Sequence, residues 1–229
     1  MVTQVMGEPS ETRDRAAANE GPLDFCQTIL AHLPWPGGES SSLARTVGLT
    51  SCYRGEGVST VASRLALAAA SCGDHKVLLV DADVACPSVH TMFSTTLTPG
   101  LSNVLFDPTR LSASVQQPSE SRLFILSAGN GGRNLFRDCD EAKLAVVFES
   151  LKSEFDLVVF DLPATTAPDF PHRLAGMLDG VLWVVEAERI WPEDALRTKE
   201  LLAGANAQII GTVLNRARRR VPRWLDGRG

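Results

Sequence analysis

Apolar and polar positions follow two alternating patterns along most of the chain. Short, nearly continuous apolar runs occur at residues 46–51, 76–81, 122–127, 156–161, 180–185 and 208–214. Longer segments at 58–71, 141–155, 171–178 and 192–203 repeat apolar residues with the period of a helix. The short runs are typical of strands that are buried on both faces. This alternation predicts an α/β fold with a mostly parallel sheet and helices on both faces.

The segments that flank this region carry weaker patterns. Residues 1–22 are polar and lack apolar periodicity, so we expect a disordered leader. Residues 23–45 predict a short N-terminal helix followed by a linker rich in Pro, Gly and Ser. Residues 216–229 form a basic tail. The expected folded domain is therefore 46–215.

Composition narrows the class of protein. The 229 residues are 44% hydrophobic and 21% charged, which is ordinary for a globular domain. A net charge of −5 gives no reason to expect a nucleic-acid partner. The sequence has no apolar run near the ~20 residues that a membrane-spanning helix requires. The five cysteines form no CxxC pair, so we expect free thiols and a cytoplasmic location.

A candidate phosphate-binding loop follows the run at 46–51. The segment LTSCYRGEGVSTVASR, residues 49–64, places a glycine-containing turn between a predicted strand and a predicted helix. In such a turn, backbone N–H groups and the positive end of the helix dipole converge on one point. Ser59 stands where a hydroxyl normally holds Mg²⁺. The nucleotide-binding residues expected here are Arg54, Gly55, Glu56, Gly57, Val58, Ser59 and Thr60.

One position departs from the P-loop pattern. The residue after the second glycine should be a lysine that contacts the β- and γ-phosphates, and here it is Val58. A charge-assisted contact contributes about 1.5–3 kcal/mol, so nucleotide affinity should fall by about one to two decades. Catalysis should suffer more, because the transition state places further charge on the γ-phosphoryl oxygens. We therefore expect ATP and Mg²⁺ as cofactors whose binding is weakened.

Carboxylates follow two of the other predicted strands. Asp81 and Asp83 come at the end of the run 76–81, and Asp161 ends the run 156–161. Ligands of parallel α/β sheets bind beyond the carboxyl ends of the strands, where these acids would meet the glycine loop. Each acid alone is also typical of a solvated strand end. Together, in this order, they indicate a site that could hold Mg²⁺.

These motifs and the segments after them resemble, in order, the cytoplasmic domain of the bacterial tyrosine kinases. Those kinases act with co-polymerases of capsule and exopolysaccharide synthesis and are related to the partition and septum-positioning ATPases. The resemblance covers about residues 46–215. The matching positions are Ser51, Gly55, Glu56, Gly57, Ser59, Leu78, Leu79, Val80, Asp81, Asp83, Pro87, His90, Gly100, Leu101, Ser102, Leu105, Leu126, Gly129, Phe155, Asp156, Asp161, Pro163, Asp179, Gly180, Val184, Val185, Gly211, Val213, Leu214 and Asn215. The resemblance implies a P-loop NTPase-like fold, with Ser59 and Asp161 serving Mg²⁺, Asp81 and Asp83 as catalytic or metal-organising acids, and Asn215 facing the nucleotide base.

Several departures from the family pattern point to a degenerate member. Val58 replaces the lysine, Ala85 an arginine and Ala164 a proline, and both arginines of the family's leading helix are lost. The kinases also carry a tail tyrosine cluster that they phosphorylate on each other, whereas Tyr53 is the single tyrosine here. We expect a regulator or partner in exopolysaccharide synthesis and export, with feeble or absent ATP hydrolysis.

The same resemblance implies a partner and leaves two other functions open. The implied partner is a membrane chain-length or co-polymerase protein, which would hold the chain at the inner face of the membrane; assembly into homo-oligomers is a further option. One alternative is an active tyrosine kinase or ATPase in which Arg54, or a cation from a partner, replaces the lysine. The other is a partition-type positioning ATPase, against which the missing loop lysines argue.

Overall fold

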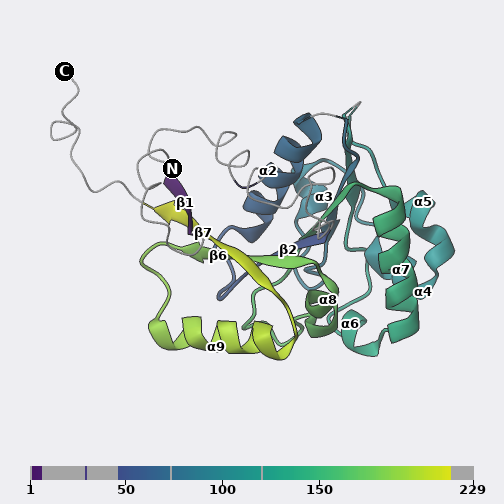
Figure 1. Cartoon of the computed structure of the whole chain (residues 1–229). Helices are drawn as coiled ribbons and strands as arrows, with labels where there is room; N and C mark the ends of the chain where they lie inside the picture. Colours follow the sequence, from purple (N-terminus) through teal and green to yellow (C-terminus); the bar gives the residue numbers. More distant parts are fainter. Residues whose placement is uncertain (1, 7–28, 30–45, 73, 120, 218–229) are drawn as a thin grey trace, which may run out of the picture.

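Six parallel strands form the centre of the molecule (Figure 1). The structure is a computed structural model, and it describes residues 2–6, 29, 46–72, 74–119 and 121–217. The strands are β2 (Thr46–Ser51), β3 (Val77–Asp81), β4 (Leu123–Leu126), β5 (Leu157–Asp161), β6 (Gly180–Glu186) and β7 (Ile209–Ala217). Their order across the sheet is β7-β6-β2-β5-β3-β4, and every neighbouring pair among them is parallel. The predicted α/β fold with a mostly parallel sheet is confirmed.

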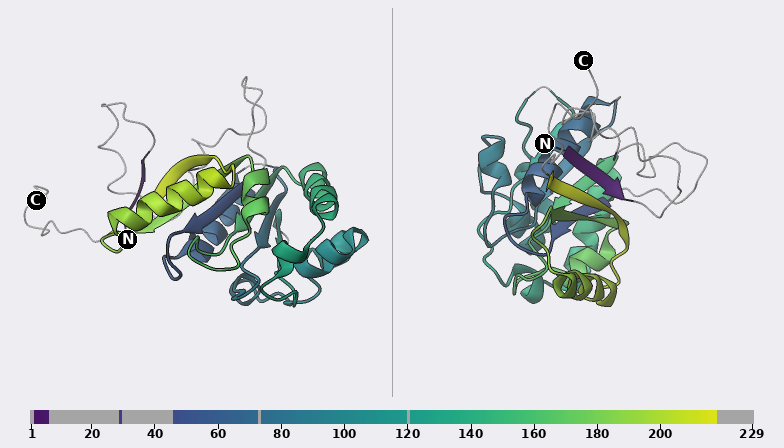
Figure 2. Two further views of the ribbon diagram at one scale, coloured as in Figure 1. Left: turned by 90° about the horizontal axis from the view of Figure 1, so that it is seen from below. Right: turned by 90° about the vertical axis from the view of Figure 1, so that its left-hand side faces the viewer.

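Helices cover both faces of this sheet (Figure 2). One face packs against α2 (Val58–Ser71) and α3 (Val89–Met92). The other packs against α4 (Leu101–Phe106), α7 (Glu141–Glu154), α8 (His172–Met177) and α9 (Pro192–Gly204), with the short helices η1 (Pro108–Arg110), α5 (Leu111–Ser114) and α6 (Leu135–Asp138) at this side. Successive β3 residues enter opposite cores, Leu79 with α2 and Leu78 with α4 and α7. Both faces are therefore apolar, which explains the continuous hydrophobic run in the sequence.

Local sequence signals define where the longer helices begin. Asp140 precedes α7 and accepts a hydrogen bond from the Ala142 N–H (2.8 Å), as an N-cap residue does. Pro192 occupies the first position of α9, where a missing N–H has no cost. Helix α2 has a different start, because its N-cap is Gly57 in the left-handed region. That start joins the helix directly to the glycine loop.

A strand near the N-terminus departs from the sequence analysis. Strand β1 (Val2–Met6) pairs antiparallel with β7 at the edge of the sheet. The expectation of a disordered leader over residues 1–22 is therefore wrong for residues 2–6. Pairing at a sheet edge satisfies backbone groups and does not require an apolar pattern in the added strand. The rest of this leader, the predicted helix and linker apart from the buried Ile29, and the tail from 218 onward lie outside the described residues.

Candidate functional site

The glycine loop joins β2 to α2 and has the backbone shape that its sequence predicts. Gly55 and Gly57 have φ values of 88° and 92°, a region that glycine enters without strain. Ser59 and Thr60 lie in the first turn of α2, where free N–H groups and the helix dipole favour an anion. Val58 is only 9% exposed and belongs to the apolar core beneath α2. The position of the lysine is thus occupied by a core side chain.

Two buried carboxylates lie side by side at the ends of adjacent strands. Asp81 of β3 and Asp161 of β5 are partners in the strand register, and they are 0% and 1% exposed. Burial raises the pKa of Asp161 well above its usual range, the neighbouring Asp81 adds to the rise, and a hydrogen bond from Ser59 opposes it. Asp161 Oδ2 has no hydrogen-bond partner among the described atoms. The strand register thus brings Asp81 and Asp161 together, and Ser59 at the start of α2 lies close enough to Asp161 to act on its pKa, so the three residues meet where the sequence analysis expected them.

Asp81 differs from Asp161 because its carboxylate is fully engaged by the backbone. It accepts hydrogen bonds from the N–H groups of Asp83 (3.2 Å), Ser88 (2.9 Å) and Val89 (3.0 Å). Burial raises its pKa to about 6, and the bonds from Val89 and Ser88 oppose the rise. Asp81 therefore shapes the segment after β3 and places negative charge beside Asp161.

The unpaired oxygen of Asp161 and the nearby Ser59 hydroxyl fit Mg²⁺, which prefers hard oxygen ligands. Within the described chain, no group of three or more His, Cys, Asp or Glu residues could hold a metal ion alone. A magnesium ion here would thus take its remaining ligands from water and from the phosphates of a nucleotide. When bound, it would neutralise charge on the phosphates next to the buried acids.

Arg54, the cation of the loop, is directed toward the acidic motif. Its Nη2 lies 3.4 Å from Asp83 Oδ2, and its Nη1 contacts Cys86 Sγ. Burial raises the pKa of Asp83, whereas the Cys86 N–H and the Arg54 charge act against the rise. About half of the Arg54 side chain remains exposed. The structure thus joins two predicted residues in one ion pair at the rim of the site.

Glu56 points into the protein. Its side chain is 0% exposed and accepts hydrogen bonds from Tyr53 N (2.8 Å) and Glu186 N (3.1 Å). Its backbone oxygen accepts a bond from Asn215 Nδ2 (2.8 Å), and Asn215 Oδ1 accepts one from Arg216 N. Both polar atoms of the Asn215 side chain are therefore engaged within the protein. The roles expected for Glu56 and Asn215 at the nucleotide stay predictions.

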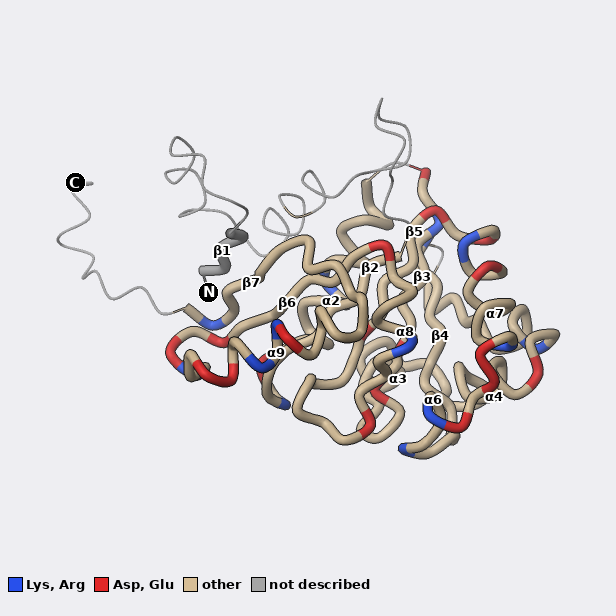
Figure 3. The backbone as a smooth tube through the Cα atoms, turned by 60° about the horizontal axis from the view of Figure 1, so that its bottom comes forward, with Lys and Arg blue, Asp and Glu red and all other residues tan. Residues whose placement is uncertain are grey.

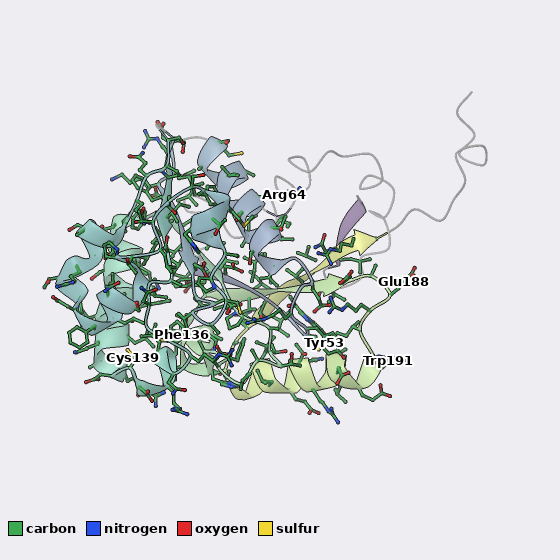
Figure 4. The ribbon with its side chains drawn as sticks, turned by 180° about the vertical axis from the view of Figure 1, so that it is seen from behind. Tyr53, Arg64, Phe136, Cys139, Glu188 and Trp191 are labelled. Carbon is green, nitrogen blue, oxygen red and sulfur yellow. The ribbon has the colours of Figure 1, made fainter. Side chains whose placement is uncertain are left out.

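The segment from the end of β6 into α9 holds residues that the sequence analysis missed. Arg189 donates from Nη2 to the Arg54 carbonyl oxygen (3.1 Å) and from Nη1 to Glu186 Oε2 (2.7 Å), and its guanidinium lies 5.8 Å from the centre of the Tyr53 ring. The Tyr53 hydroxyl donates to Asp194 of α9, and Figure 4 shows Tyr53 next to that helix. These residues belong to no motif. Only the position of Glu186 at the carboxyl end of a strand could have drawn attention to the segment.

Figure 3 shows acidic and basic positions interspersed along the described part of the chain. Among the described helices, none combines the length and apolar character needed to cross a membrane.

The fold and the glycine loop are shared with a known family of proteins. The glycine loop and the six-stranded parallel sheet define a P-loop NTPase, and a family model described as "ParA: NUBPL iron-transfer P-loop NTPase" matches residues 42–223. The tyrosine-protein kinase YwqD of Bacillus subtilis (strain 168) is 32% identical over 171 residues, which are 75% of this chain and 72% of YwqD. The chain belongs to the bacterial tyrosine kinase family, within the superfamily of the ParA and MinD P-loop ATPases.

Two further relatives extend the comparison. The crystal structure of the chimerical protein CapA2B2 superimposes with a TM-score of 0.75 at 25% identity, covering 91% of this chain and 88% of that one. The succinoglycan biosynthesis transport protein ExoP of Rhizobium meliloti (strain 1021) is 27% identical over 183 residues. These residues are 77% of this chain and 23% of ExoP, so ExoP is a much longer protein.

Proposed function

We propose that this protein works in capsule or exopolysaccharide synthesis and export as a kinase-family regulator whose nucleotide site is weakened. One observation carries the proposal. Val58 is buried at the position where a P-loop carries its lysine, while Ser59, Asp81 and Asp161 lie together beside the loop, which supports a magnesium–nucleotide site. The site can therefore bind Mg-nucleotide through backbone N–H groups and the metal, but it lacks the cation that contacts the β- and γ-phosphates. Hydrolysis of ATP is feeble or absent.

The partner in this proposal is a membrane co-polymerase. ExoP carries a region like this chain as about a quarter of its length and is a transport protein of polysaccharide biosynthesis. This chain would supply the P-loop domain, and the co-polymerase partner would supply the membrane-embedded part. Contact with the partner would then place the domain at the inner face of the membrane.

The proposal is tested by comparing the ATP hydrolysis rates of wild type, Val58→Lys, Asp161→Ala and the kinase YwqD under one set of conditions. We expect a wild-type rate far below that of YwqD and a clear gain in Val58→Lys, because the lysine stabilises charge on the transferred phosphoryl group. A wild-type rate similar to that of YwqD, abolished by Asp161→Ala, would overturn the proposal.

A second candidate is an active kinase in which Arg54 replaces the lysine. It is favoured by the position of Arg54, whose half-exposed guanidinium lies beside Asp83 at the rim of the site. In that case Arg54→Gln would remove ATP hydrolysis, while Arg137→Gln, which changes a 74% exposed arginine on α6, would leave it intact. In the weakened site that we propose, neither change alters the low wild-type rate.

A further inference from the structure

The glycine loop is attached to the segment between β6 and α9 by several contacts that do not involve a ligand. We name these contacts the loop brace; its members are Tyr53, Glu56, Glu186, Arg189 and Asp194. The Glu56 carboxylate lies at its centre and bonds to the backbone of both segments, at Tyr53 N (2.8 Å) and Glu186 N (3.1 Å). Two outer contacts join the same segments, from Arg189 to the Arg54 carbonyl oxygen and from Tyr53 to Asp194.

Burial of the Glu56 carboxylate has a free-energy cost. The Glu56 side chain is 0% exposed, and a carboxylate that is removed from water costs free energy unless hydrogen bonds replace its hydration. Among the described residues, the Glu56 carboxylate oxygens accept hydrogen bonds from two backbone N–H groups, and the positive charge of Arg189 acts on the carboxylate from nearby. An apolar residue would fill the space at a lower electrostatic cost, so the contacts themselves account for the glutamate.

The brace also reaches the opposite side of the loop. The Glu56 carbonyl oxygen accepts from Asn215 of β7, and that amide leaves no room for a side chain at Gly57. Residue 56 is therefore tied to β6 by its side chain and to β7 by its backbone. These ties fix the peptide that immediately precedes Gly57, where the N–H groups of a phosphate site must be oriented.

We propose that Glu56 is a positioning residue, which holds the glycine loop in its phosphate-binding shape before any nucleotide arrives. This inference rests on the proposed nucleotide site and deepens it, because a loop without the lysine depends more on oriented backbone N–H groups. Pre-organisation lowers the ordering cost of binding. The brace thus maintains the affinity that the site retains, through a Glu56 carboxylate that bonds to the protein backbone.

The test compares wild type with Glu56→Gln by hydrogen–deuterium exchange without ligand, followed by titration with Mg-ADP. A glutamine keeps the size of the side chain but turns an NH₂ group toward one of the two N–H donors, which then loses its acceptor. Because a hydrogen bond to a charged group is lost, backbone amides in peptides covering residues 52–57 and 184–189 should exchange at least about ten times faster than in wild type. Mg-ADP affinity should fall by about tenfold as well.

Two controls make the result specific. Glu193→Gln makes the same chemical change at an exposed position in the first turn of α9, and it should alter neither exchange nor affinity. Residues 77–80 of β3 lie apart from the brace and should keep their protection in Glu56→Gln.

The inference fails if exchange at 52–57 is unchanged in Glu56→Gln, or if exchange rises equally in β3, since the glutamate would then stabilise the whole fold. If wild type binds no Mg-ADP, the proposed nucleotide site is contradicted, and the exchange arm alone decides whether the brace holds the loop.

Discussion

At the scale of single residues, the site concentrates negative charge where a nucleotide would also bring negative charge. Asp81, Asp83 and Asp161 gather at the strand ends, and burial is the main cause of the raised pKa of each. The described cations nearest the loop, Arg54 and Arg189, each contact a carboxylate. We therefore expect phosphate binding here to depend on magnesium more strongly than it does in a loop that keeps its lysine.

The buried acids predict an unusual pH dependence of stability. The pKa of Asp81 is about 6 in the folded protein and 3.8 in the unfolded chain, so the folded state binds more protons between these values. The contribution of Asp81 to stability without ligand should therefore fall by about 3 kcal/mol as pH rises from about 4 to about 6 and then level off, while the raised pKa of Asp161 extends the decline of total stability to higher pH. Thermal denaturation across this range measures the effect.

Asp81→Asn is the variant that assigns the slope. It removes the titrating group while keeping an oxygen that accepts from the Ser88 and Val89 N–H groups. Its melting temperature should depend less on pH between 4 and 6 than that of wild type, and the slope that remains belongs to Asp83 and Asp161, whose pKa values are also raised. A wild-type protein that becomes more stable over this range would contradict the raised pKa.

Gly57 offers a second prediction at the residue scale. The backbone of Gly57 lies in the left-handed region, which side chains with a Cβ rarely adopt. A Cβ at this position would also collide with Asn215 Nδ2. Gly132 has a similar φ of +72° but open space around its Cβ position. Gly132→Ala should cost only the backbone strain, about 1–2 kcal/mol. Gly57→Ala should cost about 1–3 kcal/mol more, because the bond from Asn215 to Glu56 is also lost. Urea denaturation of both variants compares them, and equal losses would show that the Asn215 contact contributes nothing.

At the scale of secondary-structure elements, the contact between the glycine loop and α9 distinguishes this chain from what its motifs predict. Tyr53 lies in the glycine loop, and its hydroxyl bonds to Asp194 at the start of α9. The bond to Asp194, followed by burial, raises the pKa of Tyr53 to about 12. Tyr53 thus links the glycine loop to the first turn of α9.

Because Tyr53 is the single tyrosine, alkaline titration of tyrosinate absorbance reports this contact directly. The folded protein should show little tyrosinate at pH 11, and Asp194→Asn should ionise at lower pH, toward the ordinary value near 10. Circular dichroism recorded on the same samples confirms that the fold persists. Ionisation of the wild-type tyrosine near pH 10 in folded protein would contradict the bond to Asp194.

At the scale of the whole molecule, the sequence predicted the parts of the structure that depend on local pattern. Apolar runs such as 76–81 predicted strands. Asp81 and Asp161 each end such a run, so parallel strands were expected to bring them to the same edge of the sheet. The loop brace could not be predicted, since Glu186, Arg189 and Asp194 meet Glu56 and Tyr53 only because β6 lies beside β2. Strand β1 could not be predicted for a related reason. It pairs with β7 through backbone hydrogen bonds, which require no particular pattern of apolar residues in the sequence.

The central claim is that the anion-binding shape of the loop persists while its main cation is replaced by a buried valine. Isothermal titration of Mg-ADP into wild type, Val58→Lys and the uncharged control Val58→Met tests it most directly. We predict that Val58→Lys binds about ten- to a hundredfold more tightly than wild type and that Val58→Met does not. Wild-type binding as tight as that of Val58→Lys would contradict the account, because the valine would then cost the site nothing.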